Sequence, residues 1–263
     1  MRKGTVSGTF YPDDQHVLEQ MLSGFFGSCG EERADALGVV SPHAGYLCSG
    51  QTAAIALSAF PVDFSGTFIV IAPSHRGIPT CTSHEPWWTP LGAVETDREF
   101  IDAMGIRIDK PGMEADENSL EIQIPLIRYR FPGARIVPVL MGNQSYESAV
   151  STSEAIYSAI SKFPDKEIRI IASSDFTHYV PDDIAEKTDL YVIDALLELE
   201  INEFYRRLIE TNASVCGYGP ISVMMLTCIK MGAEKCRLLE YTTSGRTCGG
   251  MRQVVGYAAI AVI

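Results

Sequence analysis

Three short apolar runs along this chain each end within a few residues of a histidine. The runs are 38–40 before His43, 68–72 before His75, and 168–172 before Asp175 and His178. Short continuous apolar runs bounded by turn-forming residues are typical of strands buried on both faces of a sheet. If these strands are parallel neighbours, their carboxyl ends lie at the edge where open α/β sheets bind ligands. We therefore expect the residues after the runs to converge and form the active or binding site.

Apolar residues with helical spacing fill most of the chain between these strands. Pro12 and Pro220 suit the first turn of a helix, and Ser49 and Asp97 suit the capping position before one. The expected helices cover 12–26, 50–60, 97–104, 116–127, 147–163, 182–199, 201–210 and 221–231, and further strands are expected at 91–95, 134–141, 237–242 and 254–263. This alternation predicts an α/β fold in a single domain, 1–263, with three helix-sheet-helix layers and a mostly parallel central sheet.

Length and charge exclude several classes of protein. A chain of 263 residues can bury a large core without disulfides or structural metals. The net charge of −12 argues against a nucleic-acid partner. The longest apolar stretch, 254–263, is too short to span a bilayer, and the start carries no signal-peptide core, so we expect a cytoplasmic protein without a membrane partner. Glycine-rich nucleotide motifs and G-x-S-x-G are missing, which leaves no support for a nucleotide cofactor.

The seven cysteines include no C-x-x-C pair, and their number is odd. Both facts argue against a zinc ribbon or a disulfide framework and favour reduced thiols. Cys216 precedes the expected helix 221–231, where the helix N-terminus would lower the thiol pKa and favour the reactive thiolate. For the other cysteines we expect the role of small buried hydrophobic residues.

Other polar residues give weaker signals. Asp175 and His178 are three residues apart and can point the same way, so Asp175 can bind a metal, orient an imidazole, or simply cap a helix. Glu117 and Glu121 are four apart on an expected helix, which indicates a solvated face. Trp87 and Trp88 cannot both face a core, so we expect one of them at a rim or cleft wall.

Five segments in order resemble the motif set of the Memo family. They are 41–46 (SPHAGY), 72–75 (APSH), 116–125 (DENSLEIQIP), 173–178 (SSDFTH) and 216–220 (CGYGP). The resemblance covers nearly the whole chain. It implies a fold similar to that of class III extradiol ring-cleavage dioxygenases, which use non-haem Fe(II), and it implies a metal pocket. Radical-SAM and AMMECR-type proteins, which accompany the family in archaea and bacteria, are the partners it suggests.

The family's metal ligands correspond to His43, His75 and Cys216, with Asp175 and His178 close by. Fe(II) is the metal that the resemblance implies first, with copper as the alternative. The dioxygenases use a carboxylate where this chain has a thiolate, and the softer sulfur favours copper(I) and argues against ring cleavage. Asn118 stands where the family usually has a histidine, which in related dioxygenases can serve as acid or base, so the resemblance does not carry a proton transfer over to this position.

Three hypotheses follow. The first is a metal-dependent redox protein that acts on a small substrate, with Asp175 and His178 orienting ligands or moving protons. The second is a metal-free enzyme with Cys216 as nucleophile and a histidine as its base. The third is a module that uses the same pocket to bind a peptide or partner protein, with Trp87 and Trp88 as contact residues.

Overall fold

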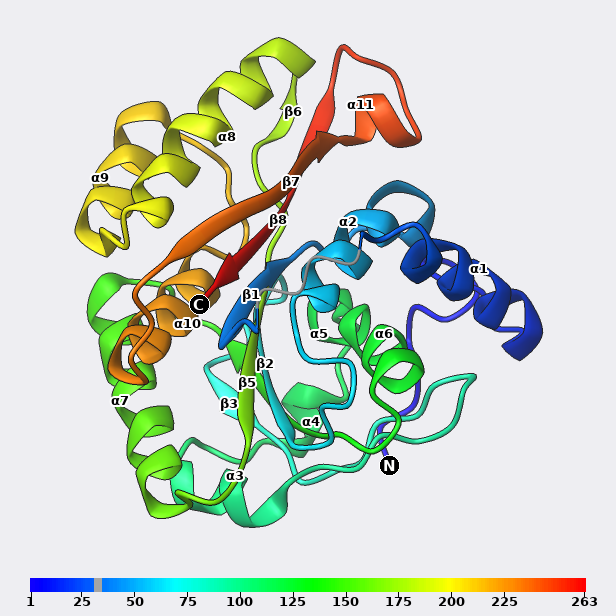
Figure 1. Cartoon of the computed structure of the whole chain (residues 1–263), viewed down its shortest axis with the longest axis vertical. Helices are drawn as coiled ribbons and strands as arrows, with labels where there is room; N and C mark the ends of the chain where they lie inside the picture. The colour runs from blue at the N-terminus through cyan, green and yellow to red at the C-terminus, as the bar shows by residue number, and fades with distance from the viewer. Residues whose placement is uncertain (31–34) are drawn as a thin grey trace.

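The computed structural model describes residues 1–30 and 35–263 and contains one mixed sheet with helices on both faces (Figure 1). The strands are β1 (Gly38–Ser41), β2 (Thr67–Pro73), β3 (Cys81–Thr82), β4 (Arg135–Met141), β5 (Ile168–Ser173), β6 (His178–Val180), β7 (Cys236–Thr243) and β8 (Val254–Val262). Their order is β3-β4-β2-β5-β1-β8-β6, and β7 also pairs with β8. The predicted α/β class, with a sheet between helical layers, is confirmed.

The four central strands β4, β2, β5 and β1 run parallel, whereas β3, β6, β7 and β8 are antiparallel to their neighbours. The three apolar runs therefore form adjacent parallel strands. Their carboxyl ends meet at one edge, where the backbone N–H of Ser174 donates to the Ser41 carbonyl at 2.9 Å. This edge is where the polar residues after β1, β2 and β5 are placed.

The helices form two layers, one on each face of the sheet (Figure 1). They are α1 (Gln15–Gly27), α2 (Tyr46–Ser58), α3 (Arg98–Met104), α4 (Lys110–Met113), α5 (Asn118–Glu121), α6 (Gln123–Arg130), α7 (Tyr146–Lys162), α8 (Asp182–Leu197), α9 (Ile201–Thr211), α10 (Tyr218–Lys230) and α11 (Ser244–Thr247). Apolar residues of α1, α2, α5 and α6 pack on one face, and those of α3 and α7–α10 pack on the other.

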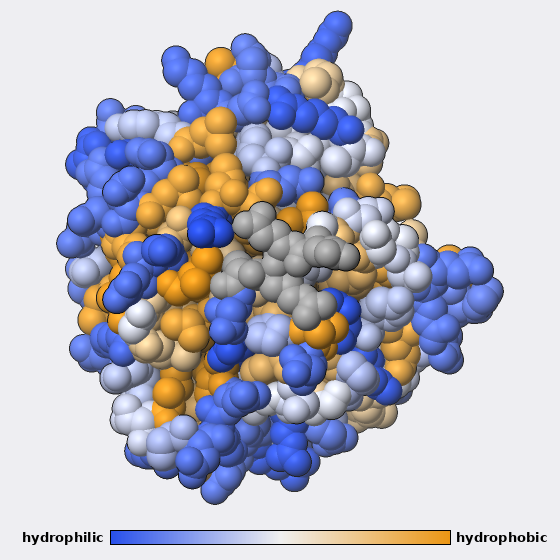
Figure 2. All heavy atoms as spheres, viewed as in Figure 1, coloured by the Kyte–Doolittle hydropathy of each residue, from blue (hydrophilic) through white to orange (hydrophobic). Residues whose placement is uncertain are grey.

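Side chains of each central strand alternate between these two cores. In β2, Phe68 and Val70 join the core beneath α2, while Ile69 and Ile71 join the core beneath α10. A strand with a core on both faces has no solvated side, which explains why its sequence is a continuous apolar run. Figure 2 shows hydrophilic side chains over the outer parts of one face of the molecule and hydrophobic residues nearer its middle.

Helix α2 begins four residues earlier than its sequence pattern predicts. Gly45 is the N-cap, and the helix starts at Tyr46, whose backbone N–H donates to the Phe10 carbonyl at 2.8 Å. The Ser49 hydroxyl donates to the Ala44 carbonyl at 3.0 Å instead of capping the helix. The early start places the first turn of α2 three residues after His43.

Other boundaries differ for similar local reasons. Helix α10 begins at Tyr218, so Pro220 is its third residue rather than its first. Two apolar residues of α8, Ile184 and Leu190, are 48% and 39% exposed, although most apolar residues of this helix are buried. The expected strand at 91–95 makes only an isolated bridge, between Val94 and Trp87.

The prediction about disulfides was wrong for two cysteines. Cys48 and Cys248 form a disulfide across a sequence separation of 200, whereas Cys29, Cys81, Cys216, Cys228 and Cys236 are free. A count of cysteines and their spacing could not reveal this pair, because the fold alone brings α2 next to the segment after α11. Among the described residues, no helix is both long and apolar enough to cross a membrane.

Candidate metal centre

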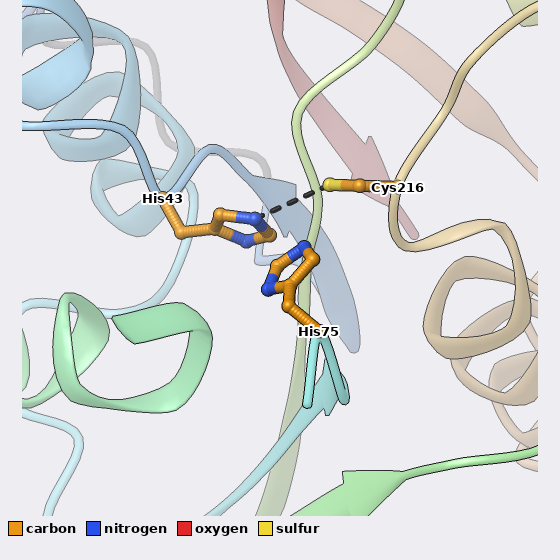
Figure 3. A group of neighbouring side chains, drawn as sticks. All are labelled: His43, His75 and Cys216. Atoms are coloured by element: carbon orange, nitrogen blue, oxygen red, sulfur yellow. Dashed lines mark hydrogen bonds between the residues drawn. The ribbon is translucent and has the colours of Figure 1, made fainter. Parts of the chain in front are cut away.

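Three side chains from distant parts of the chain meet at the carboxyl edge of the parallel strands (Figure 3). One ligand atom from each of His43, His75 and Cys216 lies within 4.8 Å of the other two. The sulfur of Cys216 is 3.2 Å from Nε2 of His43. The two imidazole rings lie edge to face, with their centroids 5.4 Å apart and an interplanar angle of 73°. His43 follows β1, His75 follows β2, and Cys216 precedes α10.

The hydroxyl of Ser173 fixes the tautomer of His43. This hydroxyl donates its one proton to the Ser119 carbonyl at 2.7 Å, so toward Nδ1 of His43, 3.0 Å away, it can only accept. Nδ1 of His43 therefore carries a proton, and Nε2 presents its lone pair toward Cys216. Burial and the nearby His75 lower the pKa of His43 to about 3, so its imidazole is neutral.

Gln123 fixes the Ser173 hydroxyl in turn. Its amide nitrogen donates to Ser173 Oγ at 3.0 Å and to the Pro42 carbonyl at 2.9 Å, while its amide oxygen accepts from the Ser41 hydroxyl at 2.8 Å. Ser41, Gln123 and Ser173 are all fully buried. Nothing in the sequence indicated this network, because serine and glutamine in apolar segments give no local signal of a shared partner.

Glu117 orients His75. One carboxylate oxygen accepts from Nδ1 of His75 at 2.8 Å, and the other accepts from the backbone N–H of His75 at 2.6 Å. Burial alone would raise the pKa of Glu117, but the hydrogen bond and charge of His75 lower it to about 2. The same hydrogen bond raises the pKa of His75, against the effect of burial. Because Nδ1 of His75 is engaged, Nε2 is its free ring nitrogen.

The predicted solvated face at Glu117 and Glu121 was wrong. Glu117 and Glu121 are only 4% and 1% exposed. Glu117 caps α5 and binds His75, and Glu121 binds the buried guanidinium of Arg2 at 2.6 Å. Helical spacing of two acids is typical of a solvated face, but here an N-terminal arm covers it.

Backbone contacts hold the Cys216 loop against the ends of β4 and β5. Gln144, just after β4, donates to the Cys216 carbonyl at 2.9 Å and accepts from the backbone N–H of Gly219 at 2.8 Å. The backbone N–H of Gly217 donates to the Ser174 hydroxyl at 2.9 Å. A Cβ at Gly217 would lie 2.5 Å from the Ser173 carbonyl oxygen, so only glycine fits this approach.

The predicted low thiol pKa of Cys216 was also wrong. Burial raises the pKa of this thiol, and the Asp175 carboxylate raises it further. The backbone N–H of Asp175 donates to the sulfur at 3.2 Å, but hydrogen bonding does not offset the effect of burial on this pKa. In the protein alone, Cys216 is therefore a neutral thiol that faces a neutral imidazole.

Asp175 and His178 lie beside this group. Oδ1 of Asp175 accepts from the backbone N–H of His43 at 2.8 Å, and burial raises the pKa of the Asp175 carboxyl. Nδ1 of His178 lies 2.9 Å from the Ser214 carbonyl, which can only accept, so this nitrogen carries the proton and Nε2 is free. Asp175 thus holds the His43 loop, whereas His178 is anchored to the chain before Cys216.

A second buried acid, Asp189, supports the same segment from α8. It accepts from the backbone N–H of Thr177 at 3.0 Å and from the Tyr241 hydroxyl at 2.8 Å, and burial raises its pKa to about 6. Between about pH 4 and pH 6 the folded protein therefore binds more protons here than the unfolded chain, so stability falls as pH rises through this window.

Asp189→Asn is expected to remove this pH dependence. The free energy of unfolding of the variant minus that of the wild type should rise by on the order of 2 kcal/mol between pH 4 and pH 7, because asparagine stays neutral. Urea unfolding of both proteins at several pH values measures this difference. A difference that stays flat with pH would contradict the assignment.

A small cleft of about 260 Å³ opens beside His75. Its lining residues are Val6, Phe10, His75, Arg76, Asp116, Glu117 and Asn118. The Asn118 amide nitrogen donates to the His43 carbonyl at 3.2 Å, so Asn118 orients the His43 loop. An amide does not exchange protons as a histidine does, so the role that the structure gives Asn118 is this hydrogen bond.

The remaining histidines and both tryptophans are placed elsewhere. His16 is exposed on α1 next to Gln20, and Nε2 of His84 lies 2.8 Å from the Asp102 carboxylate. Trp87 is 2% exposed beneath the Arg2 guanidinium, whereas Trp88 is 36% exposed. One tryptophan is thus partly exposed, and Trp87 is not available as a contact residue for a partner.

Comparisons with known proteins agree over the full length. A family model described as Memo-like protein matches residues 2–261. A MEMO1 family protein of Methanosarcina barkeri is 41% identical over 268 residues, covering 100% of both chains. MEMO1 family proteins of Archaeoglobus fulgidus and Nitrosopumilus maritimus are 39% and 35% identical, covering at least 98% of each chain. This chain therefore belongs to the family of Memo-like proteins.

Proposed function

We propose that this protein binds one redox-active metal ion through Nε2 of His43, Nε2 of His75 and the sulfur of Cys216. The observation that carries the proposal is the state of the two imidazoles. Ser173 and Glu117 each accept from an Nδ1, so Nε2 is the ring nitrogen left to bind a metal on both histidines, in a group whose ligand atoms lie within 4.8 Å of one another. Acceptors behind metal-binding histidines characteristically fix the tautomer and ring orientation in this way.

The donor set fits a transition metal. His43 is buried and neutral, as a ligand must be, and a metal ion can take the place of the proton on the Cys216 thiol. Two imidazoles and a thiolate suit iron, copper or zinc better than magnesium or calcium, which prefer oxygen ligands. Fe(II) is the first candidate, and the soft sulfur makes copper(I) the alternative.

The bound metal would supply redox chemistry, and the surrounding residues would prepare the substrate for it. The cleft beside His75 has room for a small molecule, and Phe10 and Arg76 are among its lining residues. Asp175 holds the His43 backbone, and His178 presents a free Nε2 that can accept a proton. We propose a cytoplasmic oxidoreductase role on a small substrate, with the radical-SAM and AMMECR-type proteins as candidate partners.

Metal analysis of anaerobically purified protein tests the proposal. The wild type is expected to hold about one iron or copper ion per chain after loading, and Cys216→Ser and His43→Ala should hold less than about a tenth of that. His16→Ala, at an exposed histidine on α1, is the matched control and should retain the full content. Wild-type protein that takes up neither metal would overturn the proposal.

The 3.2 Å contact between the Cys216 sulfur and His43 Nε2 also favours a second candidate, a metal-free cysteine nucleophile with His43 as its base. The neutral states of both groups argue against it, because the pKa values of His43 and Cys216 are shifted away from the ion pair that a nucleophile needs. Iodoacetamide separates the two. We expect slow alkylation of Cys216 near neutral pH and further protection by bound metal, whereas rapid stoichiometric alkylation would favour the nucleophile.

A further inference from the structure

The disulfide between Cys48 and Cys248 joins helix α2, which begins three residues after His43, to the connection between β7 and β8. Cys48 lies in the first turn of α2, five residues after His43. Cys248 lies in the connection between β7 and β8, residues 244–253, which we call the strap. Figure 1 shows α11, the first part of the strap, at the end of the β7–β8 pair and next to α2. The disulfide therefore closes the strap onto the helix that follows His43.

The strap leads directly into the strand that holds His178. Val255 of β8 pairs with His178 of β6, and the next residue, Gly256, donates its backbone N–H to the Thr177 carbonyl at 2.9 Å. Gly256 also accepts from the backbone N–H of Phe176 at 2.8 Å. Movement of the strap would therefore be transmitted to the segment that carries Asp175 and His178.

The strap has a second attachment that does not depend on the disulfide. The Arg246 guanidinium binds the carboxylates of Asp182 and Glu186 on α8, each at 2.8 Å. Within the strap, the Ser244 carbonyl accepts from the backbone N–H groups of Cys248 and Gly249 at 2.9 and 2.7 Å. The strap can thus remain folded and fixed to α8 when its bond to α2 is broken.

The position of the disulfide allows reductants to reach it. Cys248 is exposed and Cys48 is half-buried, whereas structural disulfides that resist reduction are typically protected. The other five cysteines, including Cys216 in the metal centre, form no disulfide. We propose that Cys48–Cys248 is a reversible thiol–disulfide exchange site for a dithiol reductant, and that reduction releases the strap from α2 while α8 retains it.

The exchange balances in two steps. A thiolate of the dithiol attacks the exposed sulfur of Cys248, which forms a mixed disulfide and expels the Cys48 thiolate. The second thiolate of the dithiol then attacks the first sulfur of the same dithiol, which is bonded to Cys248 in the mixed disulfide. This attack expels the Cys248 thiolate. The dithiol becomes a cyclic disulfide, and two electrons and two protons pass to the protein. A disulfide oxidant reverses the sequence.

The test uses metal-free, full-length protein under native conditions, so it does not depend on the metal proposal. Dithiothreitol should make Cys48 and Cys248 available to iodoacetamide, as located by mass spectrometry, while buried Cys228 stays unmodified. Hydrogen exchange of amides at 244–255 should become faster by about tenfold on reduction and slow again after reoxidation.

Variants separate the disulfide from general effects of the reductant. The double variant Cys48→Ser/Cys248→Ser should show the fast exchange without reductant, and Cys29→Ser, which alters a free half-buried thiol, should behave as wild type. Three outcomes would overturn the proposal: both cysteines alkylated before reduction, a disulfide that dithiothreitol cannot reduce in the folded protein, or exchange at 244–255 that reduction leaves unchanged. If the double variant does not fold, reduction of the wild type still decides.

Discussion

Replacing Glu121 with alanine is expected to lower the free energy of unfolding by about 3–5 kcal/mol, because it leaves a buried charge without its partner. Glu121 is 1% exposed, and its carboxylate accepts from the Arg2 guanidinium at 2.6 Å. It also accepts from the backbone N–H groups of Thr5 and Val6 and from the Tyr11 hydroxyl, at 2.8–3.0 Å. One side chain thus holds the N-terminal arm in place. Its removal leaves several buried donors without an acceptor at once.

Guanidinium unfolding followed by circular dichroism measures this loss. Glu114→Ala is the matched control, because Glu114 lies close by in the sequence but is 44% exposed, 3.7 Å from Lys110. The control should stay within about 0.5 kcal/mol of the wild type. Equal effects of Glu114→Ala and Glu121→Ala would show that the arm contributes no more than an ordinary surface contact.

Glu117→Gln is expected to weaken metal binding by about 10–100-fold while the fold is retained. The carboxylate accepts from both Nδ1 and the backbone N–H of His75, and it also caps α5 by accepting from the Ser119 N–H. Glutamine has the same shape but only one acceptor oxygen, so one of these donors must face an NH₂ group. The amide oxygen can still accept from Nδ1 if the NH₂ group faces the backbone N–H of His75, but in either orientation the ring loses the negative charge that increases its electron-donating strength.

Competition with a chromogenic chelator under anaerobic conditions gives the affinity, and circular dichroism checks the fold. Asp116→Asn is the matched control, because Asp116 lines the same cleft but is 68% exposed and binds Arg76 rather than a metal ligand. Its affinity should stay within about threefold of the wild type. If Glu117→Gln bound metal as tightly as Asp116→Asn, Glu117 would have no part in preparing His75.

The sequence indicated much of this site because its ligands follow elements that are easy to recognise. His43 and His75 follow apolar runs closely. These runs form strands with a hydrophobic core on each face, and the strands belong to one parallel set in the sheet. Cys216 precedes a helix in a short glycine-containing loop. In each case the local pattern fixes the end of an element, and the sheet topology then brings these ends together.

The features that the sequence missed depend on partners far away in the chain. Glu121 is buried because Arg2, 119 residues earlier, folds over it. The Cys48–Cys248 bond spans 200 residues. The thiol pKa of Cys216 was mispredicted because a helix N-terminus is visible in the sequence, whereas the burial that outweighs it is not. Local sequence patterns predict helices and strands, whereas the burial of a side chain and its distant partners are properties of the assembled fold.

The pairing of strand β8 has a consequence for the nascent chain during synthesis. It pairs with β7 through residues 256–262, with β1 through residues 260–262 and with β6 through residues 254–255, yet the ribosome synthesises it after all three. Until it emerges, β1 lacks one neighbour, and the chain at 176–178 lacks the backbone groups that hold it. A nascent chain would therefore expose unpaired strand edges throughout translation. We expect chaperones to bind the nascent chain during synthesis for this reason.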